Sequence, residues 1–262
     1  MSASTNVVHM NKAVPAKLDN VSIEFNLEGG RKLRALDNVS LELKPGEFLV
    51  LVGASGSGKT TALNMFASLL RPTSGEATVF GKAPVNARRH LGYMFARDAL
   101  MPWRTARQNI EFAMQMRGVG RAERRATATR LLSIMKLDQY GENYPSQLSQ
   151  GQRQRVALAR TWALSPDIIL MDEPFSALDA QTREELQTEF LKICAGEKKS
   201  VIFVTHDLSE ALTLADRIIV FSRGRIAEEF VIDLPKPRDM LTITESPAAR
   251  EIYKKLRSLL SH

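Results

Sequence analysis

The sequence predicts an α/β fold: a mostly parallel sheet preceded by antiparallel strands and interrupted by an inserted block of helices. A continuous apolar run at 48–52 is typical of a strand covered on both faces, and it leads into a glycine-rich turn and a helix over 59–70. Half-buried alternation at 21–25 and 39–43 indicates the antiparallel strands. Apolar strands and helices then alternate toward the C-terminus, at 168–171, 181–194, 201–205, 208–215 and 218–221.

The inserted block of helices is predicted between residues 96 and 164. Thr105 is followed three residues later by Gln108, the spacing of a capping box at a helix start. A second, arginine-rich helix is expected over 121–137, and a third begins near Ser149. We therefore divide the chain into a mobile polar tail (1–17), one large domain that contains the helical block (18–232) and a short C-terminal extension (233–262).

Composition narrows the class of protein before any motif is considered. The 262 residues are 44% hydrophobic and 25% charged, which is ordinary globular composition and excludes a disordered or collagen-like chain. A single cysteine, Cys194, excludes an intrachain disulfide framework. No apolar run approaches the roughly 18 residues of a membrane span, and the N-terminus lacks the apolar core of a signal peptide. The net charge of +7 permits an anionic partner, but a solvated basic surface carries the same charge.

A phosphate-binding loop is predicted where the 48–52 strand ends. The pattern G-x-x-x-x-G-K-[ST] is matched by Gly53, Ala54, Ser55, Gly56, Ser57, Gly58, Lys59 and Thr60. The glycines let backbone amides surround an anion, and the following helix presents its positive N-terminal end. Lys59 offers a charge to the β- and γ-phosphates, and Thr60 offers a hydroxyl to Mg²⁺. The alternative is a glycine-rich turn without a ligand, and chance gives this pattern in about one chain in a hundred of this length.

Two carboxylates, Asp172 and Glu173, follow the predicted strand at 168–171. Ligand sites of α/β proteins lie at the carboxyl ends of such strands. Asp172 is suited to the Mg²⁺ shell and Glu173 to orienting or deprotonating a water molecule, as phosphoryl transfer to water requires. The alternative is an acidic pair that caps the next helix.

Three further segments, in the correct order, resemble motifs of ABC-transporter ATPase subunits: Leu-Ser-Gln-Gly-Gln at 148–152, Ser-Ala-Leu-Asp at 176–179 and Thr-His-Asp at 205–207. The resemblance spans roughly residues 18–231 and implies a P-loop NTPase (RecA-like) fold that binds ATP with Mg²⁺ and hydrolyses ATP. The nucleotide contacts that it implies include the loop from Gly53 to Thr60, then Thr61, Ser149, Gly151, Gln152 and Asp179.

The 148–152 segment also has a physical interpretation. Ser149 and Gln152 form a second capping box, and Gly151 leaves the backbone open beside the helix start. A helix N-terminus with a free hydroxyl is suited to an anion. The resemblance implies that this end faces the γ-phosphate held by a second copy of the chain, so two copies would enclose the nucleotide. Taken alone, the segment would be an ordinary capped helix.

Two aromatic residues, His206 and Phe25, lie in sequence contexts that are less specific for a function. His206 follows an apolar strand, where a histidine is more often structural, but the resemblance implies that it contacts the γ-phosphate and the attacking water. Phe25 resembles the family's aromatic residue that stacks on adenine, and it could equally face the core.

The chain departs from the family at Ala96, which aligns with the glutamine of the Q-loop. Alanine can neither ligate Mg²⁺ nor hydrogen-bond a water molecule. We expect water to fill the position or the nearby Asp98 to substitute. We also expect hydrolysis to be slower or more dependent on the transporter partner.

Within the family, the segments at 100–105 and 233–238 resemble the ATPases of nitrate, sulfonate and taurine importers. That resemblance implies a bacterial importer subunit on the cytoplasmic face of the inner membrane, working as an ATP-dependent pair with an integral membrane permease and, indirectly, a periplasmic solute-binding protein. Residues 96–117 are the expected docking surface for the permease, and no nucleic acid is expected.

Two other functions remain open from the sequence. The arginine-rich stretch at 117–130 is compatible with an ABC-type ATPase that acts on DNA or in translation, although the chain lacks a long coiled-coil insertion and tandem cassettes. A regulatory nucleotide-binding module with little hydrolysis is supported only by Ala96. The transported solute cannot be inferred, because this subunit has no need to touch it.

Overall fold

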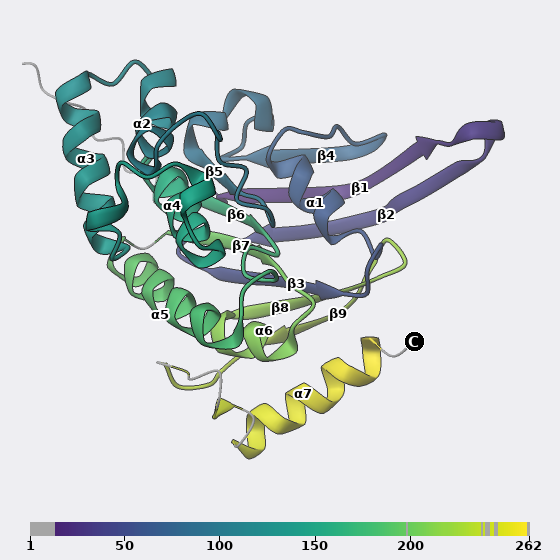
Figure 1. The fold of residues 1–262 in the computed structure, drawn as a ribbon. Helices are drawn as coiled ribbons and strands as arrows, with labels where there is room; N and C mark the ends of the chain where they lie inside the picture. Colours follow the sequence, from purple (N-terminus) through teal and green to yellow (C-terminus); the bar gives the residue numbers. More distant parts are fainter. Residues whose placement is uncertain (1–13, 198, 237, 239–241, 244–245, 261–262) are drawn as a thin grey trace, which may run out of the picture.

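The computed structural model describes residues 14–197, 199–236, 238, 242–243 and 246–260. Within these residues the chain forms two sheets, with helices between and around them (Figure 1). The larger sheet has six strands in the order β5-β6-β7-β3-β8-β9, and the smaller one has three in the order β2-β1-β4. The predicted α/β class is therefore confirmed.

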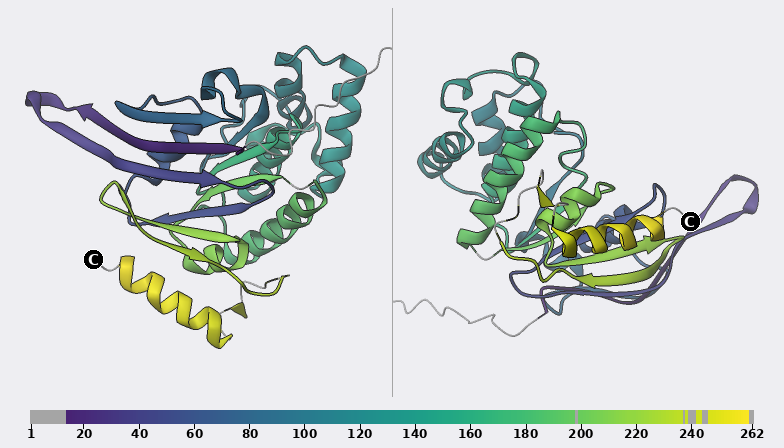
Figure 2. Two further views of the ribbon diagram at one scale, coloured as in Figure 1. Left: turned by 180° about the vertical axis from the view of Figure 1, so that it is seen from behind. Right: turned by 90° about the horizontal axis from the view of Figure 1, so that it is seen from below.

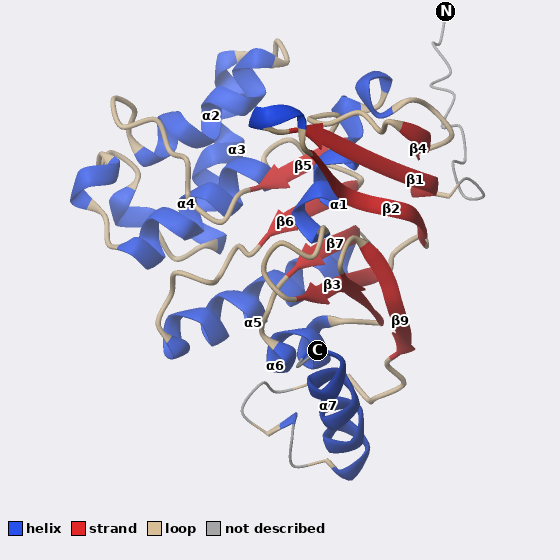
Figure 3. Ribbon diagram, turned by 90° about the vertical axis from the view of Figure 1, so that its right-hand side faces the viewer, coloured by secondary structure: helices blue, strands red, loops and turns tan. Residues whose placement is uncertain are grey.

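The larger sheet is parallel from β5 to β8, and β9 is its antiparallel edge. Its strands are β3 (Phe48–Gly53), β5 (Leu91–Met94), β6 (Ile168–Asp172), β7 (Ser200–Val204), β8 (Arg217–Ser222) and β9 (Arg225–Val231). Strands β3 and β7 are buried along their whole length, as expected of strands covered on both faces. Because the strands are parallel, the loops that follow β3, β6 and β7 meet at one edge of the sheet (Figure 3).

The smaller sheet is antiparallel and comprises β1 (Ala16–Asn26), β2 (Lys32–Leu43) and β4 (Ser74–Val79). Alternate residues of β1 are buried, which is the pattern predicted for a half-buried strand. The far end of the β1–β2 hairpin projects beyond the rest of the fold (Figure 1).

The helices divide between the faces of the larger sheet. Helix α1 (Lys59–Phe66) packs between it and the smaller sheet, whereas α5 (Ala180–Glu197) and α6 (Leu208–Leu214) pack on the opposite face. Helices α2 (Ala106–Met116), α3 (Arg121–Ile134) and α4 (Gln150–Trp162) follow β5 in the chain, precede β6, and gather at one side of the molecule (Figure 2).

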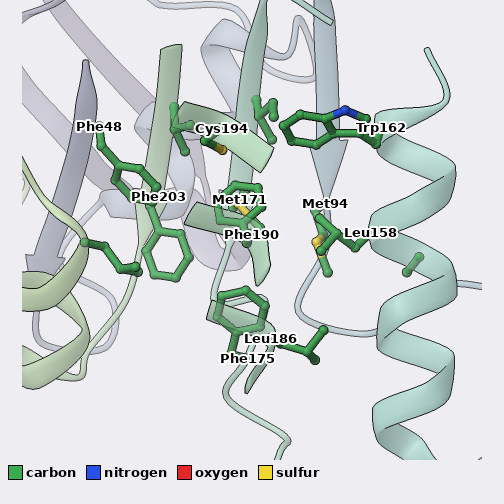
Figure 4. Close-up of a cluster of buried hydrophobic side chains, with 14 of the residues drawn as sticks. Phe48, Met94, Leu158, Trp162, Met171, Phe175, Leu186, Phe190, Cys194 and Phe203 are labelled. Carbon is green, nitrogen blue, oxygen red and sulfur yellow. The ribbon is translucent and has the colours of Figure 1, made fainter. Parts of the chain in front are cut away.

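Two hydrophobic cores result from the alternation of side chains along the buried strands. In β3, Phe48, Val50 and Val52 join the core beneath α4, α5 and α6, while Leu49 and Leu51 join the core around α1. Aromatic rings concentrate in the first core, where Phe175 and Phe203 lie 5.8 Å apart between ring centroids (Figure 4). Cys194 is a buried member of this core.

Several boundaries differ from the sequence-based expectation. Helix α1 ends at Phe66 rather than near residue 70, because Ser68 adopts a φ of 59°, which a right-handed helix does not accommodate. Helix α3 ends at Ile134. Strand β1 begins at Ala16, within the segment predicted as a tail, and residues 1–13 lie outside the described residues.

Strand β9 and helix α7 were not predicted from the sequence. The edge strand β9 is mostly exposed, so its sequence lacks an apolar run. The C-terminal extension contains α7 (Pro247–Leu260), which packs on α6 and β8 through Ala249 and Leu256. Among the described residues, no helix combines the length and apolarity needed to cross a bilayer.

Candidate functional site

The phosphate loop, residues 53–60, connects β3 to α1 and depends on glycine at two positions. Gly58 has a φ of 109°, and a Cβ there would lie 2.9 Å from the carbonyl oxygen of Ala35. A Cβ on Gly53 would lie 2.5 Å from the carbonyl oxygen of Phe221. The backbone at these positions is thus accessible only to a residue without a side chain.

The phosphate loop is also held by a distant turn. Gly224, in the turn between β8 and β9, donates its backbone N–H to the carbonyl oxygen of Ser57 at 3.0 Å. The carbonyl oxygen of Gly224 accepts from the backbone N–H of Asp37 in β2 at 2.9 Å. The turn therefore links the loop to the antiparallel sheet.

Two buried polar side chains of the loop fit an anionic ligand. The Lys59 side chain is buried, and its Nζ donates to the carbonyl oxygens of Gly53 (2.8 Å) and Ala54 (2.9 Å). Burial lowers the pKa of Lys59, while the charges of Glu173 and Asp172 oppose that shift. The buried hydroxyl of Ser57 has no hydrogen-bond partner, which costs about 1–3 kcal/mol unless a ligand supplies one.

The hydroxyl of Thr60 donates to Oδ1 of Asp172 at 2.9 Å, across the gap between α1 and the end of β6. Burial raises the pKa of Asp172, the hydrogen bond from Thr60 lowers it, and the neighbouring Glu173 raises it. Hydroxyl and carboxylate oxygens are the hard ligands that Mg²⁺ prefers. Within the described residues, no group of three or more His, Cys, Asp or Glu side chains could hold a metal ion. A cation here would therefore need oxygens from phosphate and water.

Glu173 and His206 meet at the same edge of the sheet. Oε2 of Glu173 lies 3.0 Å from Nδ1 of His206, and the backbone N–H of Glu173 donates to the carbonyl oxygen of Val204 at 3.0 Å. Glu173 has a φ of 46°, an uncommon conformation for a residue with a side chain and one often found at functional sites. The His206 side chain is exposed and available to a ligand.

The predicted capping box at the start of α4 is confirmed. The backbone N–H of Gln152 donates to Oγ of Ser149 at 3.2 Å, and the backbone N–H of Ser149 donates to Oε1 of Gln152 at 2.8 Å. Ser149 is exposed and Gln152 is half-buried, and these hydrogen bonds stay within the helix start. A Cβ on Gly151 would lie 2.7 Å from Cγ2 of Thr182, so glycine allows α4 to approach the beginning of α5.

The remaining predicted residues lie around this edge or further from it. Asp179 is exposed, and the backbone N–H of Thr182 donates to its Oδ1 at 3.0 Å; this bond lowers the pKa of Asp179. Thr61 is half-buried in α1. Phe25 is half-buried and packs against the core around α1, as one of its two predicted roles requires.

Ala96 lies in a segment that is tied to α4. Oδ2 of Asp98 accepts from Nε of Arg153 at 2.9 Å, and Oδ1 accepts from the backbone N–H of Leu100 at 3.1 Å. The carbonyl oxygen of Asp98 accepts from Arg160 at 2.8 Å. Both carboxylate oxygens of Asp98 accept hydrogen bonds within this part of the chain, so its use in place of the missing glutamine would require these bonds to be shared or broken, and it stays a prediction.

Sequence reasoning passed over two charged residues near the site, Arg183 in α5 and Glu210 in α6. Glu210 is 4% exposed and accepts a hydrogen bond from the hydroxyl of Thr205, next to His206. The available signal was Glu210 as the single charged residue of the predicted helix at 208–215.

Comparison with known proteins agrees with this arrangement. Residues 36–176 match the family model described as ABC transporter. An uncharacterized ABC transporter ATP-binding protein of Methanocaldococcus jannaschii, MJ0412, is 45% identical over 88% of this chain and 86% of its own length. The taurine import ATP-binding protein TauB of Roseobacter denitrificans is 40% identical over 88% of each chain.

Solved structures show the same fold. A dimeric, post-hydrolysis state of the ATP-binding cassette MJ0796, bound to ADP and Pi, superposes with a TM-score of 0.77 at 35% identity and covers 84% of this chain and all of that one. Fold, site and sequence relatives lead to one conclusion: the chain belongs to the ABC transporter family, as an ATP-binding subunit that hydrolyses ATP.

Proposed function

We propose that this chain binds ATP together with Mg²⁺ at the edge formed by the phosphate loop, β6 and β7, and that two copies hydrolyse ATP to drive import through a membrane permease. The observation that carries the proposal is the convergence of five residues onto one edge of the sheet: Lys59 and Thr60 at the start of α1, Asp172 and Glu173 at the end of β6, and His206 after β7.

The hydrolysis step follows from the chemistry of these groups. Lys59 and the loop amides hold the phosphates once a nucleotide displaces Lys59 from the carbonyl oxygens of Gly53 and Ala54. Glu173 orients or deprotonates the water that attacks the γ-phosphorus. His206, hydrogen-bonded to Glu173, fixes the direction of that carboxylate and contacts the γ-phosphate.

Thr60 and Asp172 are the residues that would hold Mg²⁺. When bound, the ion offsets the negative charge on the β- and γ-phosphate oxygens. The existing hydrogen bond between Thr60 and Asp172 keeps both oxygens close together. The unpartnered hydroxyl of Ser57 gives the loop a further polar contact for the nucleotide.

A second copy of the chain would complete the site. The exposed Ser149 and the half-buried Gly151 and Gln152 form a capped helix start whose capping hydrogen bonds remain within that start, and this end is suited to a γ-phosphate bound by the other copy. Asp179 is exposed and accepts a hydrogen bond from Thr182, the residue that lies against Gly151, and it would line the same interface. The dimeric state of MJ0796, a relative of the same fold, supports this pairing.

The segment 96–117 is proposed to dock on the permease. It contains two of the most exposed large apolar side chains of the described residues, Trp103 (73% exposed) and Met116 (71%). We place the protein on the cytoplasmic face of the inner membrane, with a periplasmic solute-binding protein as an indirect partner. Taurine, or another small sulfonate, is the class of solute that the named relative suggests.

Phosphate release from the purified full-length chain tests the proposal. Wild-type protein should hydrolyse ATP only with Mg²⁺, and Lys59→Ala should lose both ATP binding and hydrolysis. For docking, Trp103→Asp should reduce capture of the permease encoded with this chain, whereas Val231→Asp, a matched change at an equally exposed apolar residue of β9, should not. Mg²⁺-independent turnover or unchanged capture by Trp103→Asp would contradict the respective part.

A further inference from the structure

The backbone on both sides of His206 is held by one buried hydroxyl. Oγ1 of Thr205 donates to Oε2 of Glu210 at 2.5 Å and accepts from the backbone N–H of Asp207 at 3.0 Å. Thr205 and Glu210 are 2% and 4% exposed. The position of His206, between Thr205 and Asp207, therefore depends on a contact that lies beneath the site.

Glu210 is in turn held by α5. Its Oε1 accepts from Nε2 of Gln187 at 2.8 Å and lies 3.9 Å from Nε of Arg183. The guanidinium of Arg183 also contacts Oδ2 of Asp207 at 3.3 Å. Glu210 and Arg183 thus contact both residues that flank His206.

Arg183 reaches a second loop as well. Its Nη2 donates to the carbonyl oxygen of Leu178 at 3.0 Å. Leu178 belongs to the 176–179 segment, which ends in Asp179 and precedes α5. One guanidinium therefore bridges the segment that would face the second copy and the loop that carries His206.

This bridge is incomplete in the structure. Nε of Arg183 is buried without a hydrogen-bond partner, and Oε1 of Glu210 lies 3.9 Å from it. A shift of about 1 Å would bring this pair to ordinary hydrogen-bond distance. The contact is thus poised to form when α5 or the 176–179 segment moves.

We propose that Arg183, Glu210 and Thr205 are positioning residues that set the place of His206 relative to Glu173 and tie it to the 176–179 segment. Closure of the two copies on ATP would draw Arg183 toward Glu210 and fix His206 for hydrolysis. The inference rests on the role of His206 in the proposed function.

The alternative is a buried polar network that only stabilises the fold. A second buried network, at the opposite end of the sheet, provides a control that distinguishes a positioning role from a purely stabilising one. Glu47 is 7% exposed and accepts from Nε of Arg217 at 2.7 Å, at the beginning of β3 and therefore away from the phosphate loop. Glu47→Gln removes one buried carboxylate, as Glu210→Gln does, without touching the His206 loop.

The test measures ATP hydrolysis by the full-length chain as separate kcat and KM values, with thermal unfolding as a control for folding. Thr205→Val and Glu210→Gln should each lower kcat by about tenfold or more, because a small displacement of a catalytic group has that effect. The KM for ATP should stay within about twofold, since the phosphate loop is unchanged. Thr205→Ser, which keeps the hydroxyl, should retain the wild-type kcat.

The double variant Thr205→Val/Glu210→Gln should be no slower than the slower single variant, because both changes break one connection. Wild-type kcat in Thr205→Val and Glu210→Gln, or an equal loss in Glu47→Gln, would overturn the inference. The His206→Ala variant distinguishes failure of this inference from failure of the proposed role of His206. If His206→Ala is slow and the network variants are not, only this inference fails; if His206→Ala hydrolyses ATP normally, the role of His206 fails with it.

Discussion

Oε2 of Glu173 lies 3.0 Å from Nδ1 of His206, although 32 residues separate them in the chain. Strands β6 and β7 are parallel neighbours, and their register pairs Asp172 with Val204. The residues that follow each strand consequently emerge side by side. A carboxylate and an imidazole are thus placed together by the sheet rather than by a local motif.

Replacement of Glu173 by glutamine should separate nucleotide binding from hydrolysis. Glutamine preserves the shape of the side chain but removes the negative charge and the basicity, so kcat should fall by about 10²-fold or more. ATP affinity should change little, because the phosphate loop and Asp172 remain. Phosphate release and ATP-induced dimerisation, followed by size-exclusion chromatography, check this. A hydrolysing Glu173→Gln variant would assign the water-activating role elsewhere.

Gly58→Ala should destabilise the chain and abolish ATP binding. Alanine at a φ of 109° is strained by about 1–2 kcal/mol, and its Cβ would also lie 2.9 Å from the backbone oxygen of Ala35. Gly81→Ala is the matched control, because Gly81 has a φ of 70° but open space around its Cβ position. Denaturant unfolding should show a larger loss for Gly58→Ala. Equal losses would mean that the close approach is relieved by movement of its neighbours.

Ala96→Gln should accelerate hydrolysis. A glutamine amide supplies the acceptor and donor that alanine lacks, whereas the carboxylate of Asp98 has no donor and already accepts from Arg153. The measurement is phosphate release at saturating ATP over a range of Mg²⁺ concentrations, with Ala99→Gln as a nearby control. Unchanged turnover and Mg²⁺ dependence would show that this position has no part in hydrolysis here.

The stability of the folded chain should depend on pH through Glu210. Burial raises the pKa of Glu210 above 4.5, and the charge of Asp207 adds to this, against the hydrogen bond from Thr205 and the positive charges of Arg183 and His206. The folded chain therefore binds this proton more tightly than the unfolded chain. Its contribution to stability is complete below pH 4.5 and is lost as the pH rises through the raised pKa.

Glutamine at position 210 cannot titrate. As the pH rises from 4.5 toward neutrality, the Tm of the Glu210→Gln variant should therefore increase relative to the Tm of the wild type. Thermal melts of both proteins across that range provide the measurement. A difference that stays constant, or that moves toward the wild type, contradicts the direction of this shift.

The elements that the sequence predicted well are those with strong local signals. These signals lie within short, continuous segments: the 48–52 run, the phosphate loop and both predicted capping boxes. The structure contains each of them. Glu173 and His206 were identified through motifs, but their contact depends on strand order, which no local pattern states.

The elements that were missed have weak or misleading local signals. Strand β9 has an exposed, polar sequence because it is an edge strand. The prolines at 235 and 237 indicated an end to regular structure, and this obscured the amphipathic α7 ten residues later. The network of Arg183 and Glu210 joins side chains from α5 and α6, so only the folded chain shows that they pair.

The turn at Gly224 makes the phosphate loop depend on a part of the chain that is synthesised late. The carbonyl oxygen of Ser57 in the phosphate loop accepts a hydrogen bond from Gly224, which is synthesised long after the loop. The same turn is hydrogen-bonded to Asp37 in the antiparallel sheet. A nascent chain that has emerged only as far as β7 already carries Lys59, Thr60, Asp172 and Glu173, yet its phosphate loop still lacks the hydrogen bond from Gly224. The complete set of backbone hydrogen bonds around the loop should consequently form only when the last hairpin of the sheet has joined.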